Sequence, residues 1–560
     1  MKIALAQLNY HVGDFGNNVV RIVETIAKAK EAKADLVVFA ELSVCGYPPR
    51  DFLEFGDFIR RCDEAVVNIA LHCHGIAAIV GTPTRNPAAK GKPLYNTACF
   101  LADGRVMAMT HKTLLPNYDV FDEYRYFEPN RLPASIVEYK GFRLALTICE
   151  DLWNIADDPL YIRNPMEELA DLAPDIILNI AASPFNYNQP AIRQDILSKN
   201  ATTFGLPVVY VNQVGGQTEL IFDGGSMVVD ATGNVVTMLK EFEEDLRYHE
   251  FGKQQQVVNR KTTPPAARSA KAFSHSLLAP ETTRLNYHAL ILGIRDYFGK
   301  LGFSKAILGL SGGIDSAVTL ALAAEALGSG NVKAVLLPSQ FSSDHSIDDA
   351  RDLAENLRVP YEIIPIEKAY QAFETTLQPQ FEGLPFNIAE ENLQARIRGV
   401  ILMALSNKFG YILLNTSNKS EAAVGYGTLY GDMCGGLSVL GDVYKVQVYE
   451  LARFINRDSE IIPVNTIVKP PSAELRPGQK DSDSLPEYAI LDEILYQYIE
   501  LRTGPEELIR EGFDETTVRR VLKLVNTNEY KRAQTPPILR VSPKAFGMGR
   551  RMPIVGKYLS

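Results

Sequence analysis

The sequence lacks the features of several common protein classes. Its apolar stretches fall short of the roughly 20 residues that a membrane-spanning helix needs, and even the richest, residues 317–327, contains Glu325. The start of the chain turns polar at Gln7, too early for a secretory signal peptide. The six cysteines form no CxxC pair and no regular spacing, which argues against a zinc ribbon or a disulfide framework. These absences predict a reduced cytoplasmic protein without a membrane partner.

An excess of positive charge is also missing. The 560 residues contain 57 Lys and Arg against 67 Asp and Glu, so the net charge is −10. Such a chain lacks the basic surface that drives nucleic-acid binding through counterion release, although a local basic pocket for a phosphate-bearing small molecule is not excluded. Hydrophobic residues make up 46% and charged residues 22%, as in an average globular protein. The length suggests two to four domains, at about 150 residues per domain.

Two α/β patterns divide the chain. In residues 1–250, short β-branched runs alternate with helical stretches, and the hairpin signals at 102–105 and 231–234 add antiparallel pairs, which predicts layered mixed sheets. A stretch rich in Gln, Pro, Ala and Ser predicts a linker over residues 251–280. In residues 281–560, helices alternate with buried apolar strands, which predicts a doubly wound parallel sheet. We therefore expect two domains of the α/β class.

The strongest local motif is a glycine-rich turn between a predicted strand, residues 305–310, and a predicted helix, residues 316–327. Ligands of open parallel sheets bind at this end of the strands. Paired glycines let the backbone approach an anion closely, and the hydroxyls and first helical amides can donate hydrogen bonds to phosphate. The spacing and the lysine of a Walker A loop are absent. The motif consists of Gly309, Leu310, Ser311, Gly312, Gly313, Ile314, Asp315 and Ser316.

This motif resembles the pyrophosphate loop of the N-type ATP pyrophosphatases, which cleave ATP to AMP and pyrophosphate while adenylating a substrate. Three downstream stretches are similar to the NAD synthetase family: NTSNKSE at residues 415–421, GYGTLYGD at 425–432 and KPPSAELRPGQ at 469–479. The resemblance extends over most of residues 285–540. It implies ATP, Mg²⁺ and deamido-NAD(+) as ligands.

The resemblance also assigns roles to single residues. Thr416 and Lys445 would join the glycine-rich loop in binding ATP. Asp315 and Glu421 would hold Mg²⁺, for which carboxylates are suitable ligands. The Pro- and Gly-rich segment at residues 469–486 is expected to be a lid that excludes water from an acyl-adenylate, with a disordered loop as the alternative. Deamido-NAD(+) would be bound by Asn392, Arg396, Glu421, Asp432 and Lys531.

A second group of candidate residues lies in the first half of the chain. Glu41 and Cys149 each follow a predicted strand, and Lys112 follows a predicted hairpin. A thiol nucleophile with a carboxylate base and an ammonium suits acyl transfer from an amide. The base would take the thiol proton and pass it to the departing ammonia, while the ammonium would stabilise the oxyanion. A cysteine after an apolar strand is by itself more often a small buried hydrophobe, which is what we expect of the other five.

With their flanking residues, these three side chains resemble the nitrilase (carbon–nitrogen hydrolase) superfamily over residues 1–240, and Glu123 matches a supporting glutamate of that family. The resemblance implies a nitrilase-like α-β-β-α sandwich. Nitrilase-like domains hydrolyse many amides and nitriles, but fusion to a synthetase that needs nitrogen indicates L-glutamine. By this match Tyr118, Ser183 and Gln189 would hold the glutamine, although relatives often have a basic residue at the position of Gln189.

The whole chain thus resembles the glutamine-dependent NAD synthetase family. The resemblance implies a ligase that uses ammonia from L-glutamine and one ATP to convert deamido-NAD(+) to NAD(+), through an adenylate, with release of AMP, pyrophosphate and L-glutamate. Two sites on separate domains imply a passage for ammonia within the protein and a homo-oligomer. The alternatives are another ATP-pyrophosphatase amidotransferase, similar to GMP synthetase, and a nucleotide-binding sensor with an inactive amidase domain.

Overall fold

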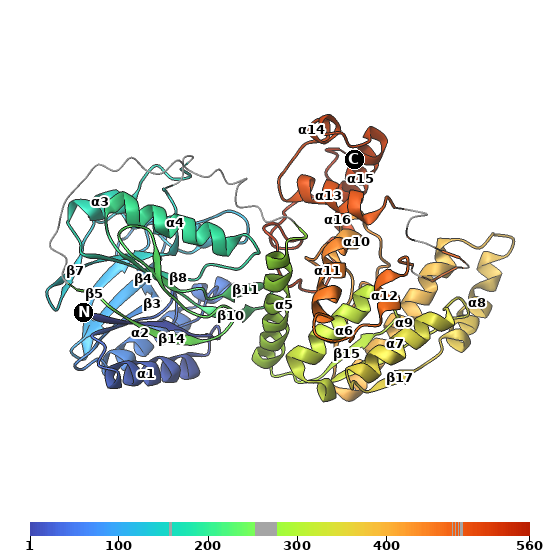
Figure 1. Ribbon diagram of the computed structural model, residues 1–560, viewed down its shortest axis with the longest axis horizontal. Coiled ribbons are helices and arrows are strands. Elements are labelled where there is room, and N and C mark those ends of the chain that lie inside the picture. Colours follow the sequence, from blue (N-terminus) through green and yellow to red (C-terminus); the bar gives the residue numbers. More distant parts are fainter. Residues whose placement is uncertain are drawn as a thin grey trace. The chain divides into compact units, whose positions relative to one another are not determined.

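The computed structural model of the protein describes residues 1–155, 159–252 and 277–559, except 473, 477, 480 and 482–484. The chain divides into two compact units, Met1–Ser274 and His275–Ser560, drawn in blue to green and in green to red in Figure 1. The predicted linker, residues 251–280, falls mostly outside the described residues, and Pro280 already belongs to a helix. No helix among the described residues has the length and apolarity to span a membrane.

The first unit contains two six-stranded sheets. One consists, in spatial order, of β14 (Asp245–Glu250), β1 (Lys2–Gln7), β2 (Leu36–Val38), β3 (Ala77–Arg85), β4 (Leu94–Ala102) and β5 (Arg105–His111). The other consists of β13 (Val235–Met238), β12 (Met227–Val229), β9 (Val208–Asn212), β8 (Ile176–Ala181), β7 (Phe142–Ile148) and β6 (Val137–Tyr139). The central pairs β1–β2–β3 and β7–β8–β9 are parallel, and the outer pairs are antiparallel. Both sheets are therefore mixed, as predicted.

The two sheets pack face to face and helices cover their outer faces. Apolar side chains of both sheets form one core, and β1 contacts β9 while β4 contacts β7. Figure 1 shows α1 (Phe15–Glu31) and α2 (Gly56–Ala70) on one side, and α3 (Pro165–Asp171) and α4 (Gln189–Phe204) on the other. A separate hairpin joins β10 (Val214–Gln217) to β11 (Leu220–Asp223). The predicted α-β-β-α sandwich is confirmed.

Local sequence explains why these elements form where they do. In α1, Ile22, Ile26 and Ala29 are buried and recur at helical spacing, while Asp14 caps the first turn by accepting a hydrogen bond from the Asn17 amide. The turn between β4 and β5 has positive φ at Asp103 and at Gly104, +51° and +76°. Asp-Gly suits such a two-residue hairpin turn, so the sequence signal located this hairpin correctly.

The second unit is built on a five-stranded sheet with only parallel pairs. Its spatial order is β17 (Tyr361–Ile363), β16 (Val332–Leu336), β15 (Ala306–Gly309), β18 (Ile412–Asn415) and β19 (Leu437–Ser438). The strand order reverses between β15 and β18, and ligands of such sheets bind at the carboxyl end of this switch point. The glycine-rich motif follows β15 directly, so the fold brings it to that edge.

Helices cover both faces of this sheet. On one face, α6 (Ile314–Leu327) contacts β15 and β16 and packs against α5 (Pro280–Leu301) and α11 (Lys445–Ile455). On the other, α9 (Ile388–Phe409) contacts β15 and β18 and packs against α8 (Glu367–Phe381). The predicted doubly wound parallel sheet is confirmed. The remaining helices are α7 (Asp344–Asn356), α10 (Lys419–Val424), α12 (Val464–Val468), α13 (Tyr488–Ile499), α14 (Pro505–Arg510), α15 (Glu515–Thr527) and α16 (Glu529–Arg532).

Candidate active sites

Cys149 lies at the end of β7, where it begins a short 3₁₀ helix, η3 (Cys149–Leu152). Its φ is +40°, a left-handed conformation that a residue with a side chain rarely adopts. The Asn179 side chain on β8 donates a hydrogen bond to the Cys149 carbonyl at 3.4 Å. Strained conformations of this kind persist where surrounding contacts enforce them, and they cluster at functional sites. The geometry therefore singles out Cys149 from the other cysteines.

The ammonium of Lys112, directly after β5, is buried between two carboxylates. Nζ donates to Glu41 Oε1 at 2.7 Å and to Glu123 Oε1 and Oε2 at 2.9 and 2.8 Å. Lys112 and Glu41 have 0% of their surface exposed. Burial by itself lowers the pKa of Lys112, but the charges of Glu123 and Glu41 outweigh it and raise that pKa well above its usual value. The lysine is therefore an ammonium at neutral pH.

Further donors hold the two carboxylates in place. Asn96 Nδ2 on β4 donates to Glu41 Oε1 at 2.7 Å, and the Ala182 amide after β8 donates to Glu41 Oε2 at 3.0 Å. The Tyr47 hydroxyl donates to Glu123 Oε1 at 2.9 Å. Burial raises the pKa of Glu123, and Lys112 opposes this rise. Asn96, Ala182 and Tyr47 carried no signal in the sequence that pointed to this site.

The electrostatics of Cys149 require a base. Burial raises the pKa of the Cys149 thiol well above its usual value, Glu41 raises it further, and Lys112 lowers it. The thiol is therefore protonated at neutral pH, and it becomes a nucleophile only when its proton is removed. Glu41, the buried carboxylate whose charge raises this pKa, is the base that the sequence analysis predicts.

The predicted glutamine contacts fall into two hydrogen-bonded groups. The hydroxyls of Tyr118 and Tyr161 donate to the same oxygen of Glu150, at 2.9 and 3.0 Å. Gln189, the first residue of α4, donates from Nε2 to the Ser183 hydroxyl at 3.3 Å. Burial raises the pKa of Glu150. The sequence analysis missed Glu150, although its position next to Cys149 was a usable signal.

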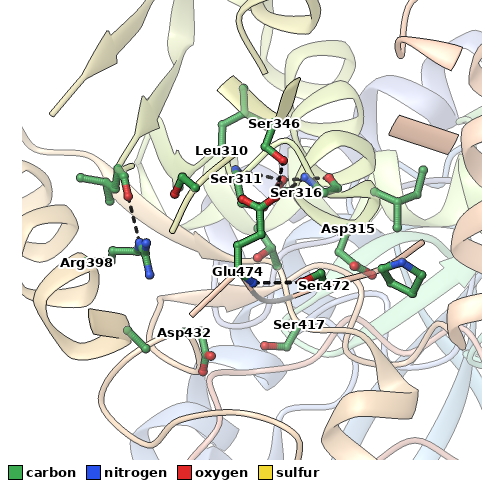
Figure 2. A pocket seen from close by; sticks show the side chains of 18 of the residues that line it. Leu310, Ser311, Asp315, Ser316, Ser346, Arg398, Ser417, Asp432, Ser472 and Glu474 are labelled. Carbon is green, nitrogen blue, oxygen red and sulfur yellow. Dashed lines mark hydrogen bonds between the residues drawn. The ribbon is translucent and has the colours of Figure 1, made fainter. Parts of the chain in front are cut away.

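The second unit has a cavity of about 330 Å³ at the switch point of its sheet, shown in Figure 2. Residues of β15, β16 and β18 form part of its wall. Of the predicted ATP-binding residues, those that line it are Gly309, Leu310, Ser311, Gly313, Ile314, Asp315, Ser316, Thr416 and Lys445. Gly312 is not among the lining residues, but it shapes the loop. Its φ is +79°, and a Cβ there would lie 2.2 Å from the Ser346 carbonyl oxygen, so only glycine fits.

Hydroxyl groups hold the glycine-rich loop in its shape. The Ser316 hydroxyl donates to the Gly313 carbonyl at 3.0 Å and accepts from the Ser311 amide at 3.3 Å, and the Gly313 amide donates to the Ser311 hydroxyl at 3.2 Å. The first turn of α6 follows at once, so its free amides and positive end lie at the cavity. Such a helix start is an anion-binding site.

One ammonium and two carboxylates meet at the other side of this loop. Lys445 Nζ forms ion pairs with Asp315 and, at 3.3 Å, with Glu421, and the Asn418 side chain donates to Asp315 at 2.8 Å. Burial lowers the pKa of Lys445, but the two carboxylates outweigh it and raise that pKa above its usual value. Burial raises the pKa of Glu421, and Lys445 opposes this. All three side chains line the cavity.

This pair of carboxylates fits the predicted magnesium ion. No group of three or more His, Cys, Asp or Glu side chains arranged for a metal exists within the described part of the chain. Mg²⁺ at nucleotide sites, however, is commonly held by one or two carboxylates and completed by phosphate oxygens and water. Asp315 and Glu421 offer that donor set beside the glycine-rich loop.

The five residues predicted to bind deamido-NAD(+) divide between the cavity and one loop, residues 425–432. Glu421 and Asp432 line the cavity, whereas Asn392, Arg396 and Lys531 are not among its lining residues. Instead, Asn392 accepts from Thr428 Oγ1 at 2.8 Å, Arg396 donates to the Leu429 carbonyl at 3.2 Å, and Lys531 donates to the Gly425 and Gly427 carbonyls at 2.7 and 2.9 Å. Burial raises the pKa of Asp432 to about 6.

The described part of the predicted lid lines the same cavity. Glu474 accepts hydrogen bonds from the Ser346 and Ser343 hydroxyls at 2.8 and 2.9 Å, and Figure 2 shows it beside Ser311. Arg398 lies across the cavity and donates to the Leu337 carbonyl at 2.9 Å, and burial lowers its pKa to about 10. The sequence analysis missed Arg398, which has no motif of its own.

Known proteins resemble the chain in both halves. The family models for carbon-nitrogen hydrolases and NAD synthases match residues 2–255 and 286–535. The glutamine-dependent NAD(+) synthetase of Synechocystis sp. is 44% identical over 560 residues, which cover 99% of this chain and 98% of that protein. The protein of the same name from Thermotoga maritima is 42% identical and covers 100% of this chain, with 99% of its own length matched. The chain belongs to the glutamine-dependent NAD(+) synthetase family.

A solved structure supports the same assignment. The glutamine-dependent NAD(+) synthetase of Acinetobacter baumannii, in complex with ADP, is 39% identical with a TM-score of 0.76, over 99% of this chain and 98% of that chain. The synthetases of this family are carbon-nitrogen ligases that use ATP. Membership in the glutamine-dependent NAD(+) synthetase family confirms the predicted pairing of a nitrilase-like half with an NAD synthase half, and it favours NAD synthesis over both alternatives.

Proposed function

We propose that this chain makes NAD(+) from deamido-NAD(+) at one site, with ammonia released from L-glutamine at another. Family membership supports the overall reaction. The observation that carries the assignment of residues is the fully buried ion pair of Lys112 Nζ and Glu41 Oε1, 2.7 Å apart, in the same unit as the strained Cys149.

At the first site, Cys149 Sγ attacks the side-chain amide carbon of glutamine while Glu41 takes the thiol proton. The Lys112 ammonium stabilises the oxyanion of the tetrahedral intermediate. Collapse of that intermediate breaks the carbon–nitrogen bond, and Glu41 passes its proton to the leaving ammonia. Water then attacks the thioester, Glu41 removes its proton, and glutamate leaves as the thiol re-forms.

Substrate contacts at this site come from the two hydrogen-bonded groups near Cys149. Tyr118, Ser183 and Gln189 hold the glutamine, through the hydroxyls and the amide described above. An amide in place of a basic side chain at Gln189 contributes a neutral donor and acceptor, so it orients glutamine without adding charge.

At the second site, the loop that ends in Ser316 binds the phosphates of ATP, and Thr416 contacts the adenosine. The carboxylate of deamido-NAD(+) attacks the α-phosphorus, and pyrophosphate leaves. Ammonia then attacks the carbonyl carbon of the adenylate, and AMP leaves. Lys445 balances phosphate charge. The residues that hold deamido-NAD(+) are Asn392, Arg396, Glu421, Asp432 and Lys531.

Asp315 and Glu421 are the residues that would hold Mg²⁺, which neutralises phosphate charge when bound. Their carboxylates lie on neighbouring helices, α6 and α10, and both already balance the Lys445 ammonium. If the two carboxylates held the metal ion, the Lys445 ammonium would be free to pair with the phosphates.

Each half of the chain carries one of the two sites, and we propose domains at residues 1–250 and 281–560 on either side of a linker. We also propose that the protein is a homo-oligomer. Apolar side chains exposed on and beside α9 support this, with Leu384 and Ile388 65% and 68% exposed and Val400 66% exposed. Light scattering during size-exclusion chromatography measures the oligomeric state directly.

The division of labour is tested by replacing Cys149 with alanine. The variant should lose NAD(+) formation with glutamine and keep NAD(+) formation with free ammonia, because the second unit does not use the thiol. Cys73→Ala, which alters another buried cysteine of the first unit, is the matched control and should keep both activities. Loss of the ammonia-dependent reaction in Cys149→Ala would refute the assignment.

A further inference from the structure

A buried carboxylate, Asp151, connects two separate segments of the first unit. Its Oδ1 accepts hydrogen bonds from the backbone amides of Thr113 and Leu114, at 3.0 and 2.9 Å, in the loop after β5. Its Oδ2 accepts from the backbone amide of Ile148, at 3.0 Å, at the end of β7. The residue is 3% exposed. One side chain thus ties three amides of two chain segments to a single carboxylate.

The segments that Asp151 joins are those that present the proposed ammonium and nucleophile. Lys112 immediately precedes the first of the bonded amides, and Cys149 immediately follows the last. Cys149 also needs support, since its φ of +40° is costly. Asp151 therefore acts on the backbone at the two points where a small shift would move the thiol relative to the ammonium.

We propose that Asp151 is a positioning residue for glutamine hydrolysis. Its carboxylate fixes the position of the Cys149 thiol relative to the Lys112 ammonium. This inference rests on the roles proposed for those two side chains. Asp151 acts through the backbone amides of Thr113, Leu114 and Ile148, to which its hydrogen bonds go. A misplacement of about 1 Å between reacting groups can lower a rate about 100-fold, so loss of the hydrogen bonds to Asp151 should have a measurable effect on catalysis.

A purely structural role predicts a different result. A carboxylate that only capped the short helix η3 would contribute about 1 kcal/mol to stability. Its loss would then lower the concentration of urea that unfolds the protein, but the folded variant would hydrolyse glutamine at the parent rate. Kinetics of the folded protein therefore separate the two roles.

Asp151→Asn tests the proposal with little change in volume. The amide has one acceptor oxygen, so its NH₂ group faces either the amide of Ile148 or those of Thr113 and Leu114, and one segment loses its partner. We expect kcat for glutamine hydrolysis to fall about 100-fold. The KM for glutamine and the ammonia-dependent synthesis of NAD(+) should stay within about twofold of the parent values, because substrate binding and the second unit are untouched.

The matched control is Asp230→Asn. Asp230 Oδ1 also accepts two backbone hydrogen bonds, from Thr232 and Asn234 at 2.9 and 3.0 Å, but in the hairpin between β12 and β13. This variant should keep the parent kcat. Alkylation by iodoacetamide, mapped by mass spectrometry, reports whether the other buried cysteines have become accessible and hence whether the first unit is still folded.

Three results would overturn the proposal. The first is a kcat for Asp151→Asn within threefold of the parent. The second is a rise in KM at constant kcat, which would make Asp151 a binding residue. The third is a fall in kcat together with alkylation of the other buried cysteines, since Asp151 would then act through stability. If Cys149→Ala still hydrolysed glutamine, the proposed function itself would fail, and Asp151→Asn alone could not produce that result.

Discussion

Replacing Lys112 by methionine should destabilise the first unit and abolish glutamine hydrolysis, because both depend on the positive charge of the ammonium. The Lys112 ammonium donates three hydrogen bonds to Glu41 and Glu123, at 2.7 to 2.9 Å, and has 0% of its surface exposed. Methionine fills a similar volume without charge. The variant therefore leaves two carboxylates buried beside each other with no cation between them.

The expected cost follows from that geometry. Removing one partner of a buried ion pair typically costs about 3–5 kcal/mol, because the remaining charge is left without compensation. The cost depends on pH. Burial raises the pKa of Glu123 and Lys112 opposes the rise, so in the variant that pKa rises further. The folded variant then binds more protons than the unfolded chain, and its stability falls as pH increases above the ordinary glutamate pKa of about 4.3. The deficit relative to the parent should be larger at pH 8 than at pH 5.5.

The single tryptophan of the chain makes this measurable. Trp153 follows η3 in the first unit, so its fluorescence during urea unfolding reports on that unit. A second variant, Lys112→Met with Glu123→Gln, removes one of the two charges and should recover part of the lost stability. It should not recover glutamine hydrolysis, which we expect to be reduced at least about 100-fold by loss of the oxyanion partner. Ammonia-dependent synthesis should remain in both variants.

Two outcomes would contradict this reasoning. A destabilisation below about 1 kcal/mol at pH 8 would show that Lys112 does not balance two buried charges. Recovery of glutamine hydrolysis in the double variant would show that the ammonium acts on Glu123 and not on the oxyanion.

Two further predictions concern single positions. Gly312→Ala should abolish AMP release from ATP while glutamine hydrolysis persists, because the new Cβ would lie 2.2 Å from the Ser346 carbonyl oxygen. The control Gly302→Ala, at a similar φ of +75° but with open space around it, should keep AMP release. Equal losses in both variants would attribute the effect to backbone strain alone. The rate of glutamine hydrolysis should decrease as pH falls through the raised pKa of Glu123, because protonation of Glu123 removes a charge that holds the Lys112 ammonium. Glu123→Gln should hydrolyse glutamine more slowly, and its kcat should depend less on pH on the acid side. An unchanged acid side of the kcat profile would assign that pH dependence to another group.

Much of the fold followed from local patterns. β7 spans the apolar run at residues 142–148, and Asp103-Gly104 forms the expected hairpin turn. Boundaries were less accurate where tertiary contacts override propensity. The strand expected at residues 305–310 is shorter, Ala306–Gly309, and the helix expected from Ser316 begins earlier, at Ile314. The predicted linker extends to residue 280, but Pro280 begins α5, because its fixed φ suits a first helical position.

The sites show a sharper division. Motifs and residue types pointed to Cys149, Glu41 and Lys112 as an amide-cleaving group and to the loop before α6 as a phosphate-binding loop, and these roles stay predictions. They did not predict that Glu123 shares the ammonium of Lys112, nor that Arg396 and Lys531 donate to carbonyls of the loop at residues 425–432. In each case the two partners lie on different segments of the chain, and no local sequence pattern indicates that they meet.

By itself, the sequence determined which reactive groups are present and which strand and loop ends carry them, since backbone periodicity and turn chemistry act over a few residues. Only the tertiary structure decided the protonation states and the partners of those groups. Glu41 and Lys112 lie 71 residues apart in the chain and meet at 2.7 Å only because β2, β4 and β5 share one sheet. The pKa of Cys149 depends on burial and on charges from those segments, and both are properties of the folded packing.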